Sequence, residues 1–330
     1  MIGLVSYLTF FATITAILAI AVLGLNLQWG NAGIFNGGGV AFFGMGAYAM
    51  IILAGPERAG EFGGFDWPWP AALLGGAVAA GVLALIVGLA TTRLRHDYLA
   101  IATFGVAVAI EAVARNASFW TGGAKGIRGF ERPLEAVIDD PFLYNLAFLA
   151  LVACVLVVVY LALERLVGSP YGRLLRAIRE DETAARALGK NPARVRLEAF
   201  IIGAVIMGVA GGLYATFYAF ISPQDLAPIL TFQIWAMLIV GGAGNNLGAV
   251  VGTFVVWGAW VASGFGLAAF APPHVQIYAG TLQYILIGLI IVGMLLAKPR
   301  GLVPERLEIT GRARDAGTGA IDGPGRQLQN

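Results

Sequence analysis

The ionisable residue best placed to do chemistry inside an apolar segment is Glu111. It lies in the run LRHDYLAIATFGVAVAIEAVARN, which starts at Leu94, and Arg115 follows it on the same face of a helix. A charged side chain at the centre of a membrane costs at least about 2.5 kcal/mol on insertion scales, so it is expected to face a cavity or a partner. Two interpretations stay open: Glu111 pairs with Arg115 within the helix, or it lines a path and orients the amino group of a zwitterion.

Four further residues are candidates for the same path, namely Thr103, Thr121, Gly122 and Gly123. The threonine hydroxyls would supply hydrogen bonds, and the glycines would supply a flexible backbone. Threonine hydroxyls also bond to carbonyls of their own helix, and glycines allow close helix packing in membranes. A packing role is therefore an equal alternative for these residues.

Patterns typical of enzymes and metal sites are missing from the sequence. His96, His274 and Cys154 lie far apart, with no further ligand at metal-binding spacing. The glycine-rich run 241–248 lacks the Gly-Lys-Ser/Thr ending of a phosphate-binding loop. No paired catalytic carboxylates or nucleophile–base set is visible. We expect a chain that is not an enzyme and holds no metal or cofactor, and its net charge of +2 does not suggest nucleic-acid binding.

The composition indicates that these residues are positioned by membrane helices. Of 330 residues, 58% are hydrophobic and 12% are charged, whereas soluble domains carry about 25% charged residues. The mean hydropathy is +0.80. No Asp, Glu, Lys or Arg precedes Glu57. The sequence therefore predicts an all-α polytopic membrane protein rather than a soluble domain.

A membrane-spanning helix needs about 20 mostly apolar residues. Nine segments are expected to span, with eight to ten as the range, and the second is glycine-rich and could be broken or re-entrant. The nine are Leu4–Leu25, Ala32–Leu53, Pro70–Ala90, Leu99–Val113, Phe142–Leu163, Leu197–Ile221, Ala227–Val240, Ala249–Ala262 and Tyr278–Ala297.

The positions of the basic residues predict the orientation. With nine spans, sixteen of the 21 Lys and Arg residues fall on one side, which the positive-inside rule assigns to the cytoplasm. The N-terminus is then outside and the C-terminus cytoplasmic. We expect a transmembrane domain over 1–309, with a polar cytoplasmic loop at 164–197, and a disordered cytoplasmic tail over 310–330.

The loop 164–197 contains the polar stretch SPYGRLLRAIREDETAARALGKNPARVRLEAF from Ser169. Leu174, Leu175, Ile178, Ala185 and Leu188 recur near helical spacing, which predicts one short amphipathic helix. A glycine at 189 and a proline at 192 are expected to end it. The helix could dock onto a partner protein, or its basic residues could rest on anionic membrane lipid.

The same stretch resembles the coupling loop of permease subunits of branched-chain amino acid ABC transporters. Other stretches resemble that family in the same order, over most of residues 25–252: LNLQWGNAGIFNGGGVAFFGMGAYAM from Leu25, the run from Leu94, TGGAKGI from Thr121 and VGGAGNNLGAVVG from Val240. Of the family's two permeases, the smaller one, which carries the TGG..GI element, fits better. The resemblance implies that the ATPase is contacted by Leu174, Leu175, Ile178, Glu182, Ala184, Ala185 and Gly189.

Two departures limit this transfer. In the family's EAA-like pattern an acidic residue directly precedes two alanines, whereas Thr183 does so here and Glu182 comes one position earlier. Many relatives also carry Ser-Leu-Gly-His where this chain has Asn-Gly-Gly-Gly at 36–39. The contact with the ATPase is still implied, with the identity of its acidic residue left open, and a substrate role for 36–39 does not transfer.

The resemblance implies a permease of an ATP-driven importer for branched-chain amino acids or related small amides. Its expected partners are a second homologous permease, two cytoplasmic ATPases that bind ATP and magnesium, a periplasmic substrate-binding protein and membrane lipid. Its expected location is the bacterial inner membrane. The alternative is an ion-coupled secondary transporter of a small zwitterion, for which Glu111 is the single intramembrane candidate.

Overall fold

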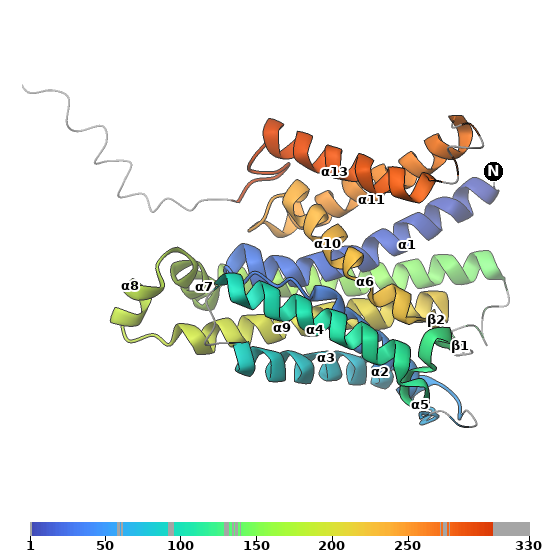
Figure 1. Cartoon of the computed structure of the whole chain (residues 1–330), viewed down its shortest axis with the longest axis horizontal. Coiled ribbons are helices and arrows are strands. Elements are labelled where there is room, and N and C mark those ends of the chain that lie inside the picture. The colour runs from blue at the N-terminus through green and yellow to red at the C-terminus, as the bar shows by residue number, and fades with distance from the viewer. Residues whose placement is uncertain are drawn as a thin grey trace, which may run out of the picture.

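The computed structural model describes residues 2–57, 60, 62–91, 96–128, 132, 133, 135, 138, 140–270, 272, 276 and 278–305, and most of them are helical. The expected tail, 310–330, lies outside the described residues. The long helices run along the molecule (Figure 1). They are α1 Ile2–Leu25, α2 Gly39–Ala54, α3 Trp69–Thr91, α4 His96–Asn116, α6 Pro141–Gly168, α9 Pro192–Tyr218, α10 Pro228–Gly241, α11 Asn246–Phe270 and α13 Ala279–Ala297.

Shorter elements connect these helices. They are the π-helical turn η1 Asn26–Asn31, α5 Ser118–Thr121, the 3-10 turn η2 Gly123–Lys125, β1 Ile127–Arg128, α7 Pro170–Glu180, α8 Glu182–Ala187, β2 Phe220–Ile221 and the 3-10 turn η3 Pro223–Leu226. The two strands pair antiparallel, with Ile127 opposite Ile221.

The long helices confirm the all-α membrane fold class. Each of the nine expected ranges overlaps one long helix. By length and composition, six helices in the described part of the chain can cross a membrane: α1 continued into η1, α3, α4, α6, α9 and α11. Helices α2 and α10 are apolar but shorter, with 16 and 14 residues. The count of nine crossings and the orientation of the termini stay predictions.

The expected second span is broken. Helix α1 runs into η1, and α2 begins only at Gly39, so residues 32–38 connect the two without a regular helix. Most of the connection is buried: the side chain of Asn36 is fully buried, whereas Phe35 is 37% exposed. Backbone without regular helical bonds is tolerated at membrane depth only where protein or a water-filled cavity surrounds it. The glycines at 37 and 38 make this possible by allowing α4 to pack directly on the connection.

Helix α9 lies at the centre of the bundle and packs against α1, α2 and α3. Its small residues allow close approach: a Cβ added to Gly203 would lie 2.6 Å from the carbonyl oxygen of Gly24 in α1. Close packing of small residues is how helices associate where lipid offers no hydrophobic driving force. This central position explains why most of the apolar side chains of α9 are buried.

The two ends of the bundle differ. Helices α7 and α8 lie at one end, at the left of Figure 1, and β1, β2 and α5 lie at the other. We call these the α7–α8 end and the β1–β2 end. The N-terminal end of α1 lies toward the β1–β2 end (Figure 1).

Candidate functional site

The polar segment resembling a coupling loop forms α7 and α8. Ser169 begins α7, because its side chain accepts a hydrogen bond from the backbone N–H of Tyr171 at 3.2 Å and Pro170 fills the first turn. Leu175 and Ile178 lie on the inner face and belong to the main hydrophobic core. The apolar stripe seen in the sequence therefore holds α7 on the bundle.

The segment contains two helices instead of the one expected, because the chain is extended at Asp181. The Asp181 carboxylate accepts hydrogen bonds from the backbone N–H groups of Thr183 at 2.8 Å and Ala184 at 2.9 Å. An acidic cap stabilises the first turn of a helix, so α8 starts anew at this point. As expected, Gly189 follows the end of α8, with φ +75°.

The seven residues expected to contact an ATPase differ in exposure. They are buried at Leu175, Ile178 and Ala185, half-buried at Leu174 and Glu182, and exposed at Ala184 and Gly189. The buried residues contact the rest of this chain, so mainly the exposed residues are free to contact an ATPase directly. Their role in coupling stays a prediction.

One residue with an open apolar side chain was left out of that set. Leu188 directly follows α8 and is 79% exposed, although it continues the apolar repeat of the segment. It is the large apolar side chain that the described α7–α8 segment leaves open to a partner. In the sequence, Leu188 can be recognised because it continues the apolar repeat after Ala185, the last residue of that repeat that is buried.

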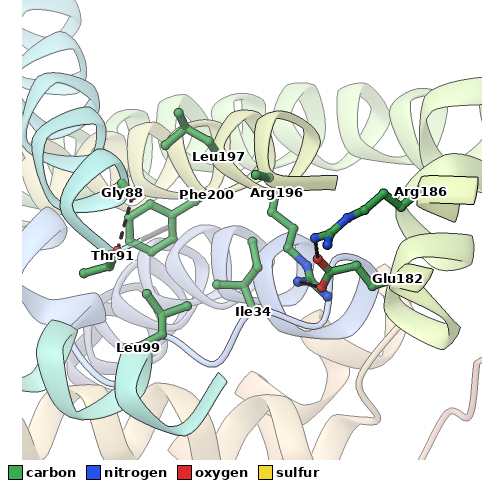
Figure 2. A pocket seen from close by; sticks show the side chains of 10 residues that line it. Ile34, Gly88, Thr91, Leu99, Glu182, Arg186, Arg196, Leu197 and Phe200 are labelled. Carbon is green, nitrogen blue, oxygen red and sulfur yellow. Dashed lines mark hydrogen bonds and ion pairs between the residues drawn. The ribbon is translucent and has the colours of Figure 1, made fainter. Parts of the chain in front are cut away.

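Glu182 ties α8 to α9. Its carboxylate accepts a hydrogen bond from Arg186 at 2.6 Å and another from Arg196 in α9. Figure 2 shows both guanidinium groups directed at this carboxylate. Glu182 is therefore already paired, which favours a role in holding α8 in place.

Beside this ion-pair cluster lies a small cavity of about 100 Å³ (Figure 2). It is lined by Ile34, Gly88, Thr91, Leu99, Glu182, Arg186, Ala193, Arg196, Leu197 and Phe200. The walls away from the cluster are mostly apolar. The cavity leaves space beneath α8 at its contact with the bundle.

Tyr171 provides a second tie between the loop and α9. Its hydroxyl donates a hydrogen bond to the carbonyl oxygen of Val195 at 3.3 Å. Burial, together with a smaller contribution from the carboxylate of Glu198, raises the pKa of Tyr171 to about 12. The hydroxyl therefore stays protonated at neutral pH and remains a donor.

Glu111 and Arg115 form the intrahelical ion pair that was one of the two interpretations. The two side chains are 2.6 Å apart, and Glu111 is 18% exposed against 50% for Arg115. The pair lies in the last turns of α4, toward the β1–β2 end. A role of Glu111 in substrate contact stays a prediction.

Thr103 packs against the broken segment between α1 and α2. Its hydroxyl accepts a hydrogen bond from the backbone N–H of Gly37 at 3.0 Å and contacts the carbonyl oxygen of Leu99 at 2.9 Å. A Cβ added to Gly37 would lie 2.7 Å from the carbonyl oxygen of Ala100, so only a glycine fits at this distance. Thr103 is buried, and it lies about 12 Å along α4 from Glu111 at about 1.5 Å per residue.

Thr121, Gly122 and Gly123 shape the loop that carries β1. The hydroxyl of Thr121 donates to the carbonyl oxygen of Ala114 at 2.6 Å, and both glycines have positive φ. Gly126 packs on the segment after α9, where an added Cβ would lie 2.8 Å from the Cα of Ser222. The TGG..GI element thus allows β1 to pair with β2, and a path-lining role stays a prediction.

Polar residues buried around η1 were not singled out from the sequence. Asn26 donates to Asn246 Oδ1 at 2.9 Å and accepts from the backbone N–H of Gly244 at 2.8 Å. Asn246 donates in turn to Glu164 Oε1 at 3.0 Å. We call these four residues the Asn26 junction. It joins η1, the turn between α10 and α11, and the end of α6, from which the α7 segment continues.

A neighbouring set of bonds holds the broken segment. Gln28 donates to the carbonyl oxygen of Phe200 at 2.8 Å and accepts from Asn36 Nδ2 at 2.8 Å. Trp235 Nε1 donates to the carbonyl oxygen of Asn36 at 2.9 Å. Buried polar groups need such partners, so this part of the chain is held in one arrangement.

The residues expected to have functional roles therefore lie in three places. The coupling candidates share the α7–α8 end, Glu111, Thr121 and the two glycines lie toward the β1–β2 end, and Thr103 lies between them. Among the described residues, no three His, Cys, Asp or Glu side chains come together as a metal site.

Comparison with known proteins identifies the family of the chain. The family profile described as "Branched-chain amino acid transport system / permease component" matches residues 7–295. The chain is 31% identical over 315 residues to the high-affinity branched-chain amino acid transport system permease protein LivM of Salmonella typhimurium, covering 89% of this chain and 69% of that protein. A probable LivM of Methanocaldococcus jannaschii is 29% identical, covering 71% and 68%. No solved structure matches the chain.

The permease LivH of Salmonella typhimurium is 27% identical over 175 residues, covering 53% of this chain and 52% of LivH. The aligned lengths and coverages make LivM longer than LivH, and LivM is the relative that matches more of this chain. The expected family is therefore confirmed, but the expectation that the better-fitting permease is the smaller one is wrong. With a family match over most of its length, the chain is a multi-pass membrane protein and itself a transport permease rather than an enzyme. It belongs to the family of branched-chain amino acid transport system permease components.

Proposed function

We propose that this chain is the permease subunit of an ATP-driven importer for branched-chain amino acids or related small amides. It forms half of the translocation path, and a second homologous permease forms the other half. Two ATPases bind ATP and magnesium on the cytoplasmic side, and a periplasmic protein delivers the substrate. The complex resides in the bacterial inner membrane.

The observation that carries this proposal is the construction of the α7–α8 end. The segment is fixed to the bundle by Leu175, Ile178 and Ala185, while Ala184 and Leu188 are exposed. A segment that is anchored on one side, and that exposes Leu188 among charged residues on the other, suits docking of a soluble partner. Glycine at 189 lets the chain turn back directly into α9. A docked ATPase would therefore act on the permease through α7 and α8.

The test is the substrate-stimulated ATPase activity of the assembled complex. Leu188→Asp places a charge in the apolar contact and is expected to remove most of the stimulation and to weaken co-purification of the ATPases. Leu143→Asp is the matched control, because Leu143 is an exposed leucine in the first turn of α6, outside the α7–α8 segment. Stimulation that is unchanged in Leu188→Asp would contradict docking at this surface.

A secondary transporter would behave differently in the same preparation. The Glu111 carboxylate, its single candidate ion-coupling group, is already paired with Arg115. Uptake that proceeds without ATPase subunits and collapses with a proton or sodium gradient would replace the proposal with this alternative.

A further inference from the structure

Arg179 is the residue of α7 that reaches furthest into the rest of the chain. Its guanidinium donates a hydrogen bond to the carbonyl oxygen of Gly30 in η1. The same group pairs with the carboxylate of Glu305, at 3.1 Å to Oε1 and 3.0 Å to Oε2. In the sequence, Arg179 is 149 residues away from Gly30 and 126 residues away from Glu305. One side chain thus joins three segments that are distant in the sequence.

The first of these segments, η1, leads directly into the Asn26 junction. A Cβ added to Gly30 would lie 2.9 Å from the Cα of Gly244, so η1 and the turn between α10 and α11 are in close contact. Asn26, at the start of η1, accepts a hydrogen bond from the N–H of that same Gly244. A displacement of the Gly30 carbonyl must therefore move the junction as well.

The second segment follows α13 and is fastened to the same turn. The backbone N–H groups of Leu302 and Val303 donate to the carbonyl oxygens of Val240 and Gly241, each at 2.9 Å. A Cβ added to Gly244 would lie 2.8 Å from the Cδ of Glu305. The Arg179–Glu305 pair therefore links α7 to the end of α10 through the chain that follows α13.

The surroundings of Arg179 leave room for movement. A recess of about 730 Å³ is lined in part by Trp29, Gly33, Phe35 and Arg179, and a second of about 500 Å³ is lined in part by Trp29 and Glu305. The Arg179 side chain is 23% exposed and that of Glu305 is 20% exposed. The polar contacts of Arg179 thus lie at a partly hydrated surface, where such contacts can exchange with water. By contrast, Leu175 and Ile178 fix α7 through a dry core.

The π-helical form of η1 is a further reason to expect that η1 moves when α7 moves. A π-helical turn is rare and is frequently found at functional sites. The carbonyl of Gly30 belongs to this turn, and Arg179 bonds to it directly. A donor on α7 therefore bonds directly to a carbonyl of this irregular turn.

We propose that Arg179 is a positioning residue for transport, which transmits the movement of α7 to η1 and, through Glu305, to the turn between α10 and α11. This inference rests on the proposed function, because it assigns a route by which a docked ATPase acts on the membrane helices. Arg179 acts through Gly30 and Glu305 and does not itself touch the substrate.

The test uses the complete complex of permeases, ATPases and binding protein in proteoliposomes. The readout is the number of ATP molecules hydrolysed per leucine imported, together with the stimulation of ATP hydrolysis by the loaded binding protein. Arg179→Gln is expected to raise that ratio, with a loss of stimulation of about tenfold. Arg179→Lys keeps a cationic donor and is expected to restore part of the coupling.

The matched control is Arg194→Gln, which removes an arginine paired with Glu198 over four residues at an exposed position of α9. Its ratio is expected to equal that of the unchanged protein. To separate coupling from assembly, Glu305→Gln is the second variant: it leaves α7 intact and is expected to raise the ratio as well. A normal ratio in Glu305→Gln and in assembled Arg179→Gln would overturn the inference. A complex of unchanged protein without substrate-stimulated hydrolysis would instead overturn the proposed function.

Discussion

Replacing Gly24 with alanine tests the close contact of α1 with α9. A Cβ at this position would lie 2.6 Å from the carbonyl oxygen of Gly203 and 3.2 Å from Met207 Cγ. Real Cβ atoms essentially never approach another atom closer than 3.0 Å, so the backbone of α9 must retreat by at least about 0.4 Å. A backbone carbonyl cannot rotate away as a side chain can, so the strain is shared by both helices.

The magnitude follows from two opposing effects. Overpacking of a well-packed core costs about 1–3 kcal/mol, whereas alanine is favoured over glycine in a helix by about 1 kcal/mol. Gly105 of α4 provides the matched control, because nothing lies within 4 Å of a Cβ added there. Both variants gain the same helix propensity, so their difference isolates the steric cost. We expect Gly24→Ala to unfold with a free energy about 2 kcal/mol lower than Gly105→Ala.

The assay is equilibrium unfolding of the purified chain in mixed detergent micelles, followed by tryptophan fluorescence. Folded material is compared first by size-exclusion chromatography, so that only native protein enters the measurement. Equal free energies of unfolding for the two variants, or a more stable Gly24→Ala, would refute the reasoning that α1 and α9 are in backbone contact here.

Three further predictions concern the paired polar groups. Glu182→Gln weakens the link from α8 to Arg196, and a half-exposed ion pair contributes at most about 1 kcal/mol, so trypsin should cleave the segment about fivefold faster than in the control Glu198→Gln. Asn26→Leu leaves the N–H of Gly244 without its acceptor, and the free energy of unfolding in micelles should fall by about 1–3 kcal/mol, whereas the exposed Asn116→Leu should change it little. Glu111→Gln should leave substrate competition profiles unchanged if the carboxylate only pairs with Arg115, and an altered profile would favour contact with substrate.

The sequence predicted the parts of the fold that depend on local pattern. Apolar runs marked the long helices, the glycines near residue 37 marked a possible break, and the stripe containing Leu175 and Ile178 marked a helix with one buried face. These features depend on neighbouring residues and on burial in an apolar medium. They required no knowledge of distant contacts.

Other features depend on partners that are far away in the chain. Asn26 meets Asn246 across 220 residues, and Arg179 meets Glu305 across 126, so no local pattern reveals either contact. The division of α7 from α8 depends on a side-chain cap at Asp181, which competes with continuation of the helix. Glu182 looked available to a partner, but the structure pairs it with Arg196. Thr103 and Glu111 share one helix about 12 Å apart along its axis, so a route lined by both would have to run along α4.

The most direct test of the central claim is uptake of labelled leucine into proteoliposomes that contain this chain with its partner permease and ATPases, in the presence of the binding protein. We predict that uptake requires ATP on the side of the ATPases, persists without an ion gradient, and is lost in Leu188→Asp. Uptake by the chain without ATPases, driven by a proton or sodium gradient, would contradict the account.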